Sequence, residues 1–281
     1  MNRRDRIKLV FTRNWKFPGK ERLSSYLLKS YKKNASGKTN IAWLANEDIA
    51  IFADPNSFIE WQVASMGAYE DEINKLIRIS LKHGDTAIDV GGNIGLQSIR
   101  MSQAVGENGR VYSFEPLIYL QEKFKKNIVL NRVYNVTLMP LALSDTESTA
   151  EFTIDPNGDN QGTFSLADTG PGAEKQLVDV KIADSLLELV ALQALHLVKI
   201  DVEGFELQVL RGMKGLLQKH KPRLIFEYDT PLWARTGQDI KTCYQFLSDM
   251  GYLFYQVTEA GCGKINSWEE IESGNLFCMQ A

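Results

Sequence analysis

The chain has 281 residues, of which 44% are hydrophobic, and its formal net charge at pH 7 is −3. This length and composition exclude a disordered chain, a collagen-like repeat and a small disulfide-rich module, and they leave one large domain or two small ones. No apolar run reaches about 18 residues, and none follows the basic N-terminal residues, so we expect neither a membrane span nor a secretory signal.

Positive charge is concentrated at the start of the chain. Residues 1–40 contain twelve Lys and Arg against Asp5 and Glu21, a net charge of +10, so the remaining residues sum to −13. An acidic body repels phosphate, and we therefore expect no nucleic-acid partner. Residues 1–36 have apolar positions at mixed helical spacing. They are interpreted as a solvated helix or homodimerisation arm, or alternatively as a segment that touches an anionic membrane surface weakly.

Short extended segments and one amphipathic helix lead into the main part of the chain. The pattern predicts strands over 41–44 and 49–52 and a helix over 70–81. We therefore divide the chain into a basic, helical N-terminal extension with short strands at 1–60 and a larger domain at 61–281.

Strands and helices alternate from Asp85 onward. Strands are predicted at 86–90, 110–114, 136–143, 195–202 and 223–228, with two late strands at 252–257 and 276–279. The intervening helices are predicted at 94–105, 117–130, 205–220 and 241–250. This α/β alternation predicts a Rossmann-like, mostly parallel sheet with helices on both faces. Segments 151–154 and 177–182 predict a β-hairpin insertion with a long polar loop at 155–162.

A glycine-rich turn lies between the first strand of this alternation and its helix, with the sequence Asp89-Val90-Gly91-Gly92-Asn93-Ile94-Gly95. Such a turn lets the backbone approach a ligand closely and exposes helix N-terminal N–H groups. Glu115 ends the second strand, where a carboxylate can accept both hydroxyls of a ribose. Asn93 replaces a glycine of the dinucleotide fingerprint, and Asp89 suits a cationic sulfonium better than a diphosphate. The turn therefore favours S-adenosylmethionine over NAD.

Charged residues also follow the fourth strand of the alternation. Lys199, Asp201 and Glu203 alternate and share one face if the strand continues. Ligands of open α/β sheets lie beyond the carboxyl ends of the strands, so these side chains are candidates for the site. The alternative is a salt-bridged strand end with Glu203 or Glu206 capping the next helix.

The chain resembles the FkbM family of S-adenosylmethionine-dependent methyltransferases over about residues 60–230. The resemblance depends on the order and spacing of seven motifs: Gly67–Glu70, Ile88–Gly95, Phe114–Pro116, Asn127–Asn131, Leu141–Ser144, Val198–Gly204 and Pro222–Glu227. One departure is Gly92, where members often have alanine, and we expect this change to be harmless.

The resemblance implies a class I methyltransferase fold, with a seven-stranded sheet whose last strand is antiparallel. It also implies methyl transfer to a hydroxyl of a sugar, glycolipid or polyketide-like acceptor. When the roles of the family's residues are carried over to the matching motifs, the methionine part of the cofactor would be lined by Asp89, Gly91, Gly92, Asn93 and Gly95. The ribose would be held by Glu115, the adenine side would be formed by Asn131, Ala142 and Ser144, and the cofactor would be covered by Tyr69 and Glu70.

An alcohol is a poor nucleophile unless a base takes its proton. We expect Asp201 or Glu203 to be this base, with Glu227 as the third candidate. Lys199 would tune their pKa or stabilise the developing alkoxide. No ligand set specifies a metal, so none is expected, although Asp201, Glu203 and Glu227 are the residues that could gather one.

Three other interpretations remain. The chain could be a catalytically silent binding protein of the same fold, an NAD-linked oxidoreductase, or a peripheral protein of anionic surfaces whose active part is residues 1–36. Cys243, Cys262 and Cys278 form no metal-ligand pattern, which is typical of reduced cysteines in a cytoplasmic protein.

Overall fold

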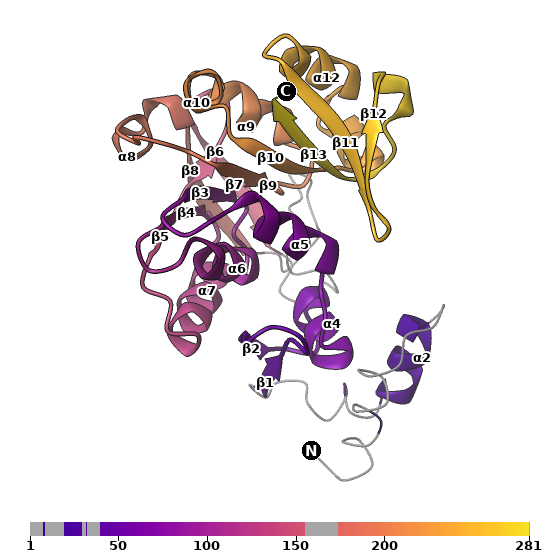
Figure 1. The fold of residues 1–281 in the computed structure, drawn as a ribbon. Helices are drawn as coiled ribbons and strands as arrows, with labels where there is room; N and C mark the ends of the chain where they lie inside the picture. The colour runs from indigo at the N-terminus through magenta and orange to yellow at the C-terminus, as the bar shows by residue number, and fades with distance from the viewer. Residues whose placement is uncertain (1–7, 9–19, 30–31, 33–39, 155–173, 281) are drawn as a thin grey trace.

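The structure is a computed structural model that describes residues 8, 20–29, 32, 40–154 and 174–280 (Figure 1). Of the helical segment predicted at 1–36, the described part includes helix α2 (Lys20–Leu27). The rest of that prediction and the predicted loop at 155–162 lie outside the described residues. Within the described residues, no helix is both long and apolar enough to cross a lipid bilayer.

Among the described residues, eight strands form the central sheet in the order β12-β11-β13-β10-β9-β3-β4-β5 (Figure 1). They are β3 (Thr86–Val90), β4 (Arg110–Phe114), β5 (Val136–Met139), β9 (Leu197–Ile200), β10 (Arg223–Tyr228), β11 (Tyr252–Thr258), β12 (Gly261–Ile265) and β13 (Gly274–Gln280). The five strands from β5 to β10 run parallel. Strand β13 lies antiparallel between β10 and β11. The class I fold with an antiparallel last strand is confirmed, but the sheet has eight strands instead of seven among the described residues, because β12, which was not predicted, pairs with β11.

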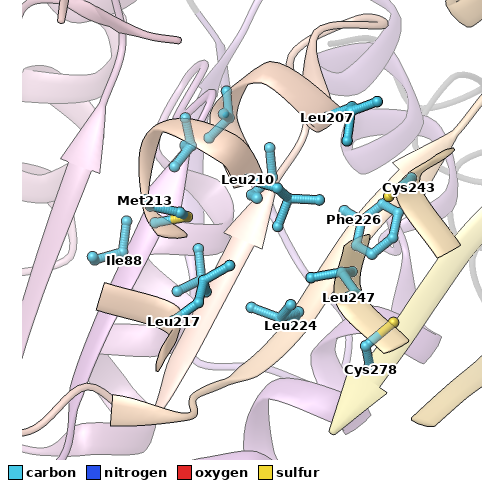
Figure 2. Packing of buried hydrophobic residues seen from close by; sticks show 14 of the residues in the cluster. Ile88, Leu207, Leu210, Met213, Leu217, Leu224, Phe226, Cys243, Leu247 and Cys278 are labelled. Carbon is cyan, nitrogen blue, oxygen red and sulfur yellow. The ribbon is translucent and has the colours of Figure 1, made fainter. Parts of the chain in front are cut away.

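Helices cover both faces of this sheet. They are α5 (Asp71–Ser80), α6 (Leu96–Val105), α7 (Ile118–Leu130), α9 (Glu206–Gly212), α10 (Lys214–His220) and α12 (Ile240–Ser248). Figure 2 shows one side, where Leu210 and Leu217 of the helices pack with Leu224 and Phe226 of β10. Ile225, between these two strand residues, belongs to the opposite cluster, which contains residues of α5. Burial on both faces explains why the strands are continuous apolar runs.

Two predicted elements are each split in two. The strand predicted at 136–143 ends at Met139, because Pro140 has no N–H to donate to the sheet. Residues Ala142–Leu143 form a separate strand, β6, that leaves the main sheet and pairs with β8. The helix predicted at 205–220 breaks into α9 and α10 at Met213, whose φ of −116° is not helical.

The predicted hairpin insertion is confirmed and belongs to a small separate sheet. Strands β7 (Ser148–Ile154) and β8 (Glu174–Lys181) pair antiparallel, and β6 pairs with β8 in parallel. The remaining short elements on this side of the fold and near the C-terminus are η1 (Ala183–Ser185), α8 (Leu187–Val190), α11 (Thr230–Arg235) and η2 (Trp268–Glu270).

An N-terminal hairpin is attached to the side of helix α7. Strands β1 (Asn40–Trp43) and β2 (Ala50–Ala53) pair antiparallel, and helix α4 (Phe58–Met66), which was not predicted, follows them. The backbone N–H groups of Ala50 and Phe52 donate to the side chains of Asn131 and Asn127, both at 2.9 Å. The two asparagines thus satisfy the outer edge of β2 in place of a third strand.

Candidate active site

Two adjoining cavities lie beyond the carboxyl ends of the parallel strands. The larger, of about 620 Å³, has a mainly apolar wall that includes Phe114, Leu141 and Phe205. The smaller, of about 450 Å³, is mainly polar and includes Glu70, Asn93 and Glu115. Both cavities are lined by Gly91, Glu203, Leu232 and Arg235. The glycine-rich turn therefore lies between an apolar and a polar compartment, as a ligand with a heterocycle at one end and charge at the other requires.

Gly91 packs directly on the backbone that follows β9. Its φ is +86°, and a Cβ atom built on it would lie 1.9 Å from the carbonyl oxygen of Asp201. At the neighbouring Gly92, a Cβ would lie 2.2 Å from the side-chain oxygen Ser113 Oγ. Glycine is therefore required at Gly91 by fixed backbone atoms, whereas at Gly92 the departure from the family's alanine leaves room for Ser113.

Glu115 supports the turn as well as lining the smaller cavity. Its carboxylate accepts hydrogen bonds from the backbone N–H of Asn93 at 2.8 Å and of Leu117 at 2.9 Å. Burial raises the pKa of Glu115 to about 8, although these two hydrogen bonds act in the opposite direction. Glu115 thus links the ends of β3 and β4 at the position where the sequence predicts ribose binding.

Asp89 is fully buried beneath the turn and lines neither cavity. Its Oδ2 accepts a hydrogen bond from Ser98 Oγ at 2.5 Å. Burial raises the pKa of Asp89, and Lys199 partly offsets this effect. The structure therefore places this carboxylate behind the turn rather than on the cavity wall where the sequence predicted it.

Lys199 is the cation at the centre of an acidic cluster. It is 3% exposed, and its Nζ lies 2.9 Å from Asp201 Oδ2. Burial alone would lower the pKa of Lys199, but Asp201, Glu70 and Asp89 outweigh it and raise the pKa. Lys199 is thus held charged inside the fold, where it compensates carboxylates from three different segments.

We expect the Lys199→Met variant to lose about 3–5 kcal/mol of the free energy of unfolding at pH 8, because buried carboxylates lose their counter-charge. The loss should shrink at pH 5.5, where protonated carboxyls need no cation. Urea unfolding followed by circular dichroism measures the free energy of unfolding at each pH. In the control variant Lys181→Met, which removes an exposed pair with Glu147, the expected loss is below about 1 kcal/mol. Equal losses in the two variants would contradict this account of Lys199.

The predicted alternation of Lys199, Asp201 and Glu203 along one strand face is wrong. Strand β9 ends at Ile200, and Glu203 has a left-handed backbone with φ of 56°. Glu206, which we had considered as a helix cap, holds this loop: its Oε1 accepts from the N–H of Val202 at 2.9 Å. The loop turns Glu203 into both cavities while Lys199 stays buried inside the sheet.

Glu203 and Glu227 are brought together at the smaller cavity, with Asp201 beside them. Burial and the neighbouring carboxylates Asp201 and Glu227 raise the pKa of Glu203 to about 8. Burial and Asp201 raise the pKa of Glu227 to about 7. In the part of the chain that the structure describes, no side chain hydrogen-bonds to or pairs with Glu203. Glu203 is therefore free to accept a proton from a ligand.

Tyr69 and Glu70 line the smaller cavity from the N-terminal side, next to the turn. Burial raises the pKa of Tyr69, and the neighbouring Glu70 adds to this effect. Glu70 has a left-handed backbone with φ of 47° at the start of α5. Both residues lie where the sequence predicts them to cover a ligand.

The predicted adenine side is only partly assembled. Ala142 and Ser144 line the larger cavity. Asn131 lies outside both cavities, because its amide donates to the carbonyl oxygen of Ala50 at 2.6 Å and its Oδ1 accepts from the same residue. This amide is committed to the N-terminal hairpin, so the predicted contact of Asn131 with an adenine is not part of this site.

Two cations on the cavity walls were not identified from the sequence. Lys123 on α7 lines the smaller cavity and lies 2.6 Å from Glu60 Oε1. Arg235, at the end of α11, lines both cavities. Lys123 could have been sought from the sequence through its partner Glu60, an acidic residue within the apolar run of α4.

Acidic groups outnumber these cations on the wall of the smaller cavity. Six carboxylates line it, those of Glu70, Glu115, Asp201, Glu203, Glu227 and Asp229. Over the described residues, no group of three or more His, Cys, Asp or Glu side chains is arranged to hold a metal ion. An acid-rich cavity of this kind favours a ligand that itself carries positive charge, such as a sulfonium and an ammonium.

Two curated relatives are similar to part of the chain. Methyltransferase 1 of Beauveria bassiana is 26% identical over 59% of this chain and 73% of its own length. The hexuronic acid methyltransferase AglP of Haloferax volcanii is 28% identical over 56% of this chain, and the match spans 62% of that relative. A solved S-adenosylmethionine-dependent O-methyltransferase of Thermotoga maritima is 13% identical, with a TM-score of 0.45 over 91% of this chain and 81% of that one.

A family model gives the most direct assignment. Residues 89–254, from the glycine-rich turn to strand β11, match the methyltransferase FkbM domain. The matched part is more than half of the chain and contains the turn, Glu115 and the Lys199–Glu203 segment. The chain is thus a methyltransferase that uses S-adenosylmethionine, and it belongs to the FkbM family.

Proposed function

We propose that this methyltransferase transfers its methyl group to a hydroxyl oxygen, and that the acceptor is a sugar, a glycolipid or a polyketide-like alcohol. The observation that carries the proposal is the Glu203 carboxylate, which projects into the polar cavity with a pKa raised to about 8 and has no partner among the described residues. A base with a pKa near the working pH suits an alcohol, whose proton must leave as the oxygen attacks.

The two cavities suggest how the cofactor would lie. Its adenine would occupy the apolar compartment beside Ala142 and Ser144, and its ribose would reach Glu115. Its methionine part would lie in the acidic compartment near Glu70 and Asp201. When bound, S-adenosylmethionine supplies a methyl group on a positively charged sulfur, which is already a good leaving group.

The protein's own contribution is then alignment and proton transfer. The cavity wall would hold the acceptor oxygen in line with the methyl group, and such positioning is worth about 7–11 kcal/mol in well-oriented systems. Glu203 would take the hydroxyl proton as the new bond between oxygen and carbon forms. Lys199 donates a hydrogen bond to Asp201 and holds that neighbouring carboxylate in place.

The similarity to AglP supports a sugar as the acceptor, because that relative is a hexuronic acid methyltransferase. The acidic wall of the smaller cavity favours a neutral sugar ring, and Arg235 and Lys123 are the cations on that wall that an acidic sugar would meet. A sugar hydroxyl as acceptor is therefore compatible with the activity of the relative and with the charges on the cavity wall, for a neutral or an acidic sugar ring.

The experiment is a methyl-transfer assay with neutral sugars, hexuronic acids, glycolipids and polyketide-like alcohols. Each acceptor is paired with an analogue that lacks one hydroxyl. We expect S-adenosylhomocysteine to form with a hydroxyl acceptor and not with its deoxy partner, and we expect mass spectrometry to show one added methyl group on oxygen. Methylation at nitrogen or carbon would overturn the proposal. Binding of the cofactor without turnover on the whole panel would favour the catalytically silent protein.

A further inference from the structure

A chain of buried polar side chains connects the β1–β2 turn to the smaller cavity. Arg100 on α6 is 2% exposed, and its Nε and Nη2 donate to the two carboxylate oxygens of Glu47 at 2.8 and 2.5 Å. Its Nη1 donates to Gln97 Oε1 at 3.4 Å. Gln97 Nε2 in turn donates to Glu70 Oε2 at 2.6 Å. A residue of the N-terminal hairpin is thus linked in three steps to a carboxylate on the cavity wall.

The chemistry of the groups fixes the direction of this chain. A guanidinium only donates hydrogen bonds, so the oxygen of the Gln97 amide must face Arg100. The NH₂ end of the same amide must then face Glu70, whose carboxylate oxygen accepts the hydrogen bond. The bidentate pair with Glu47 holds the Arg100 guanidinium in one plane, which in turn selects one orientation of Gln97.

Glu70 has neighbours besides Gln97, because the Tyr69 side chain hydrogen-bonds to it and the Lys199 cation lies near it. Glu70 precedes α5 in a left-handed conformation, with φ of 47° and ψ of 54°. Burial raises the pKa of Glu70, and Asp201 adds to this effect, while Lys199, Gln97 and Arg100 act to lower it. The relay from Glu47 therefore orients this carboxylate and, through Gln97 and Arg100, offsets part of the rise in its pKa.

We propose that Glu47 and Arg100, acting through Gln97, position the Glu70 carboxylate for the positively charged end of the cofactor. The proposal rests on the placement of Glu70 at the cofactor given above. The β1–β2 turn is then part of the cofactor site, although it lies before the segment 89–254 that carries the family match. Glu47, Arg100 and Gln97 are positioning residues, since Gln97 alone among them reaches the cavity residue.

A double-mutant cycle tests the relay. The dissociation constant of S-adenosylmethionine is measured by calorimetry for Glu70→Gln, Glu47→Gln and the variant with both changes. We expect each single change to weaken binding about tenfold, since hydrogen bonds to charged groups are involved. The double variant should bind no more weakly than Glu70→Gln alone, because Glu47 acts only through Glu70. The KM for the cofactor should rise accordingly while kcat changes less than about twofold.

Glu47→Gln leaves Arg100 buried without its anion, so this variant can fail to fold. The test is therefore repeated with Gln97→Met, alone and combined with Glu70→Gln. Gln97→Met keeps that ion pair and removes only the central amide, and it should show the same non-additivity with Glu70→Gln. Glu151→Gln, which breaks an exposed pair with Lys175, is the control and should bind the cofactor normally.

The outcomes distinguish the placement of Glu70 at the cofactor from the relay that positions Glu70. Unchanged binding in Glu70→Gln would overturn the placement of Glu70 and the relay with it. Weakened binding in Glu70→Gln with normal binding in Gln97→Met and Glu47→Gln would overturn the relay alone. If the factors by which the single changes raise the dissociation constant multiply in the double variants, Glu47 and Gln97 only stabilise the fold. That result also overturns the relay.

Discussion

The Gly91→Ala variant is expected to lose binding of S-adenosylmethionine by at least about 100-fold, which corresponds to about 2.8 kcal/mol. A Cβ atom at this position would lie 1.9 Å from the carbonyl oxygen of Asp201, and the backbone φ of +86° already disfavours alanine. The overlap involves backbone on both sides, so it can be relieved only by separating the turn from the loop after β9. That separation would change the wall shared by the two cavities, and calorimetric titration measures the result.

Gly84 provides a matched control for this effect. Its φ of +90° is close to that of Gly91, but a Cβ there would meet nothing within 4 Å. Gly84→Ala should therefore cost about 1–2 kcal/mol of stability for the left-handed backbone and leave the affinity for the cofactor unchanged. Similar affinities in the two alanine variants would show that the contact of Gly91 with Asp201 has no part in binding.

The Glu203→Gln variant is expected to lower kcat by more than about 100-fold while cofactor affinity stays within a few fold. A base works only when it is deprotonated, so kcat/KM of the unmodified enzyme should rise with pH up to about 8, the pKa of Glu203, and then level off. The same rise in kcat should lie at lower pH, because a bound sulfonium favours the ionised carboxylate. The variant should lose this rise altogether.

Two further variants sharpen the assignment of the base. Glu259→Gln changes an exposed carboxylate in the turn after β11 and should leave the pH profile unchanged. Asp201→Asn should lower stability as well as activity, because it removes the partner of Lys199. Retained turnover in Glu203→Gln together with a lost pH dependence in Asp201→Asn would transfer the role of base to Asp201.

The α/β fold could be predicted from the sequence because the strands are buried on both faces. Continuous apolar runs such as that of β10, alternating with helical periodicity, specify a covered parallel sheet without any tertiary information. The eighth strand could not be predicted, because Gly261–Ile265 contains two glycines and a lysine and pairs only through the hairpin with β11. The loop after β9 was misread for a similar reason, since Glu206 ends the strand through a contact that sequence spacing does not show.

The candidate site was predictable where it depends on local motifs and not where it depends on distant pairs. The turn and Glu115 follow one another at a recognisable spacing, and the structure places both at the cavities. The ion pairs of Glu47 with Arg100 and of Glu60 with Lys123 join segments 53 and 63 residues apart. Such pairs depend on how the N-terminal hairpin and helix α4 pack on α6 and α7, which no single segment encodes.

The excess of carboxylates on the smaller cavity has a consequence for the end of the catalytic cycle. Once its methyl group has left, the cofactor carries a neutral thioether in place of the sulfonium. With the cofactor placed as proposed, Glu70, Asp201 and Glu203 would then lose one of the positive charges that balanced them. We therefore expect the site to hold the charged form of the cofactor more tightly than the spent form, so that the transfer step itself would favour product release.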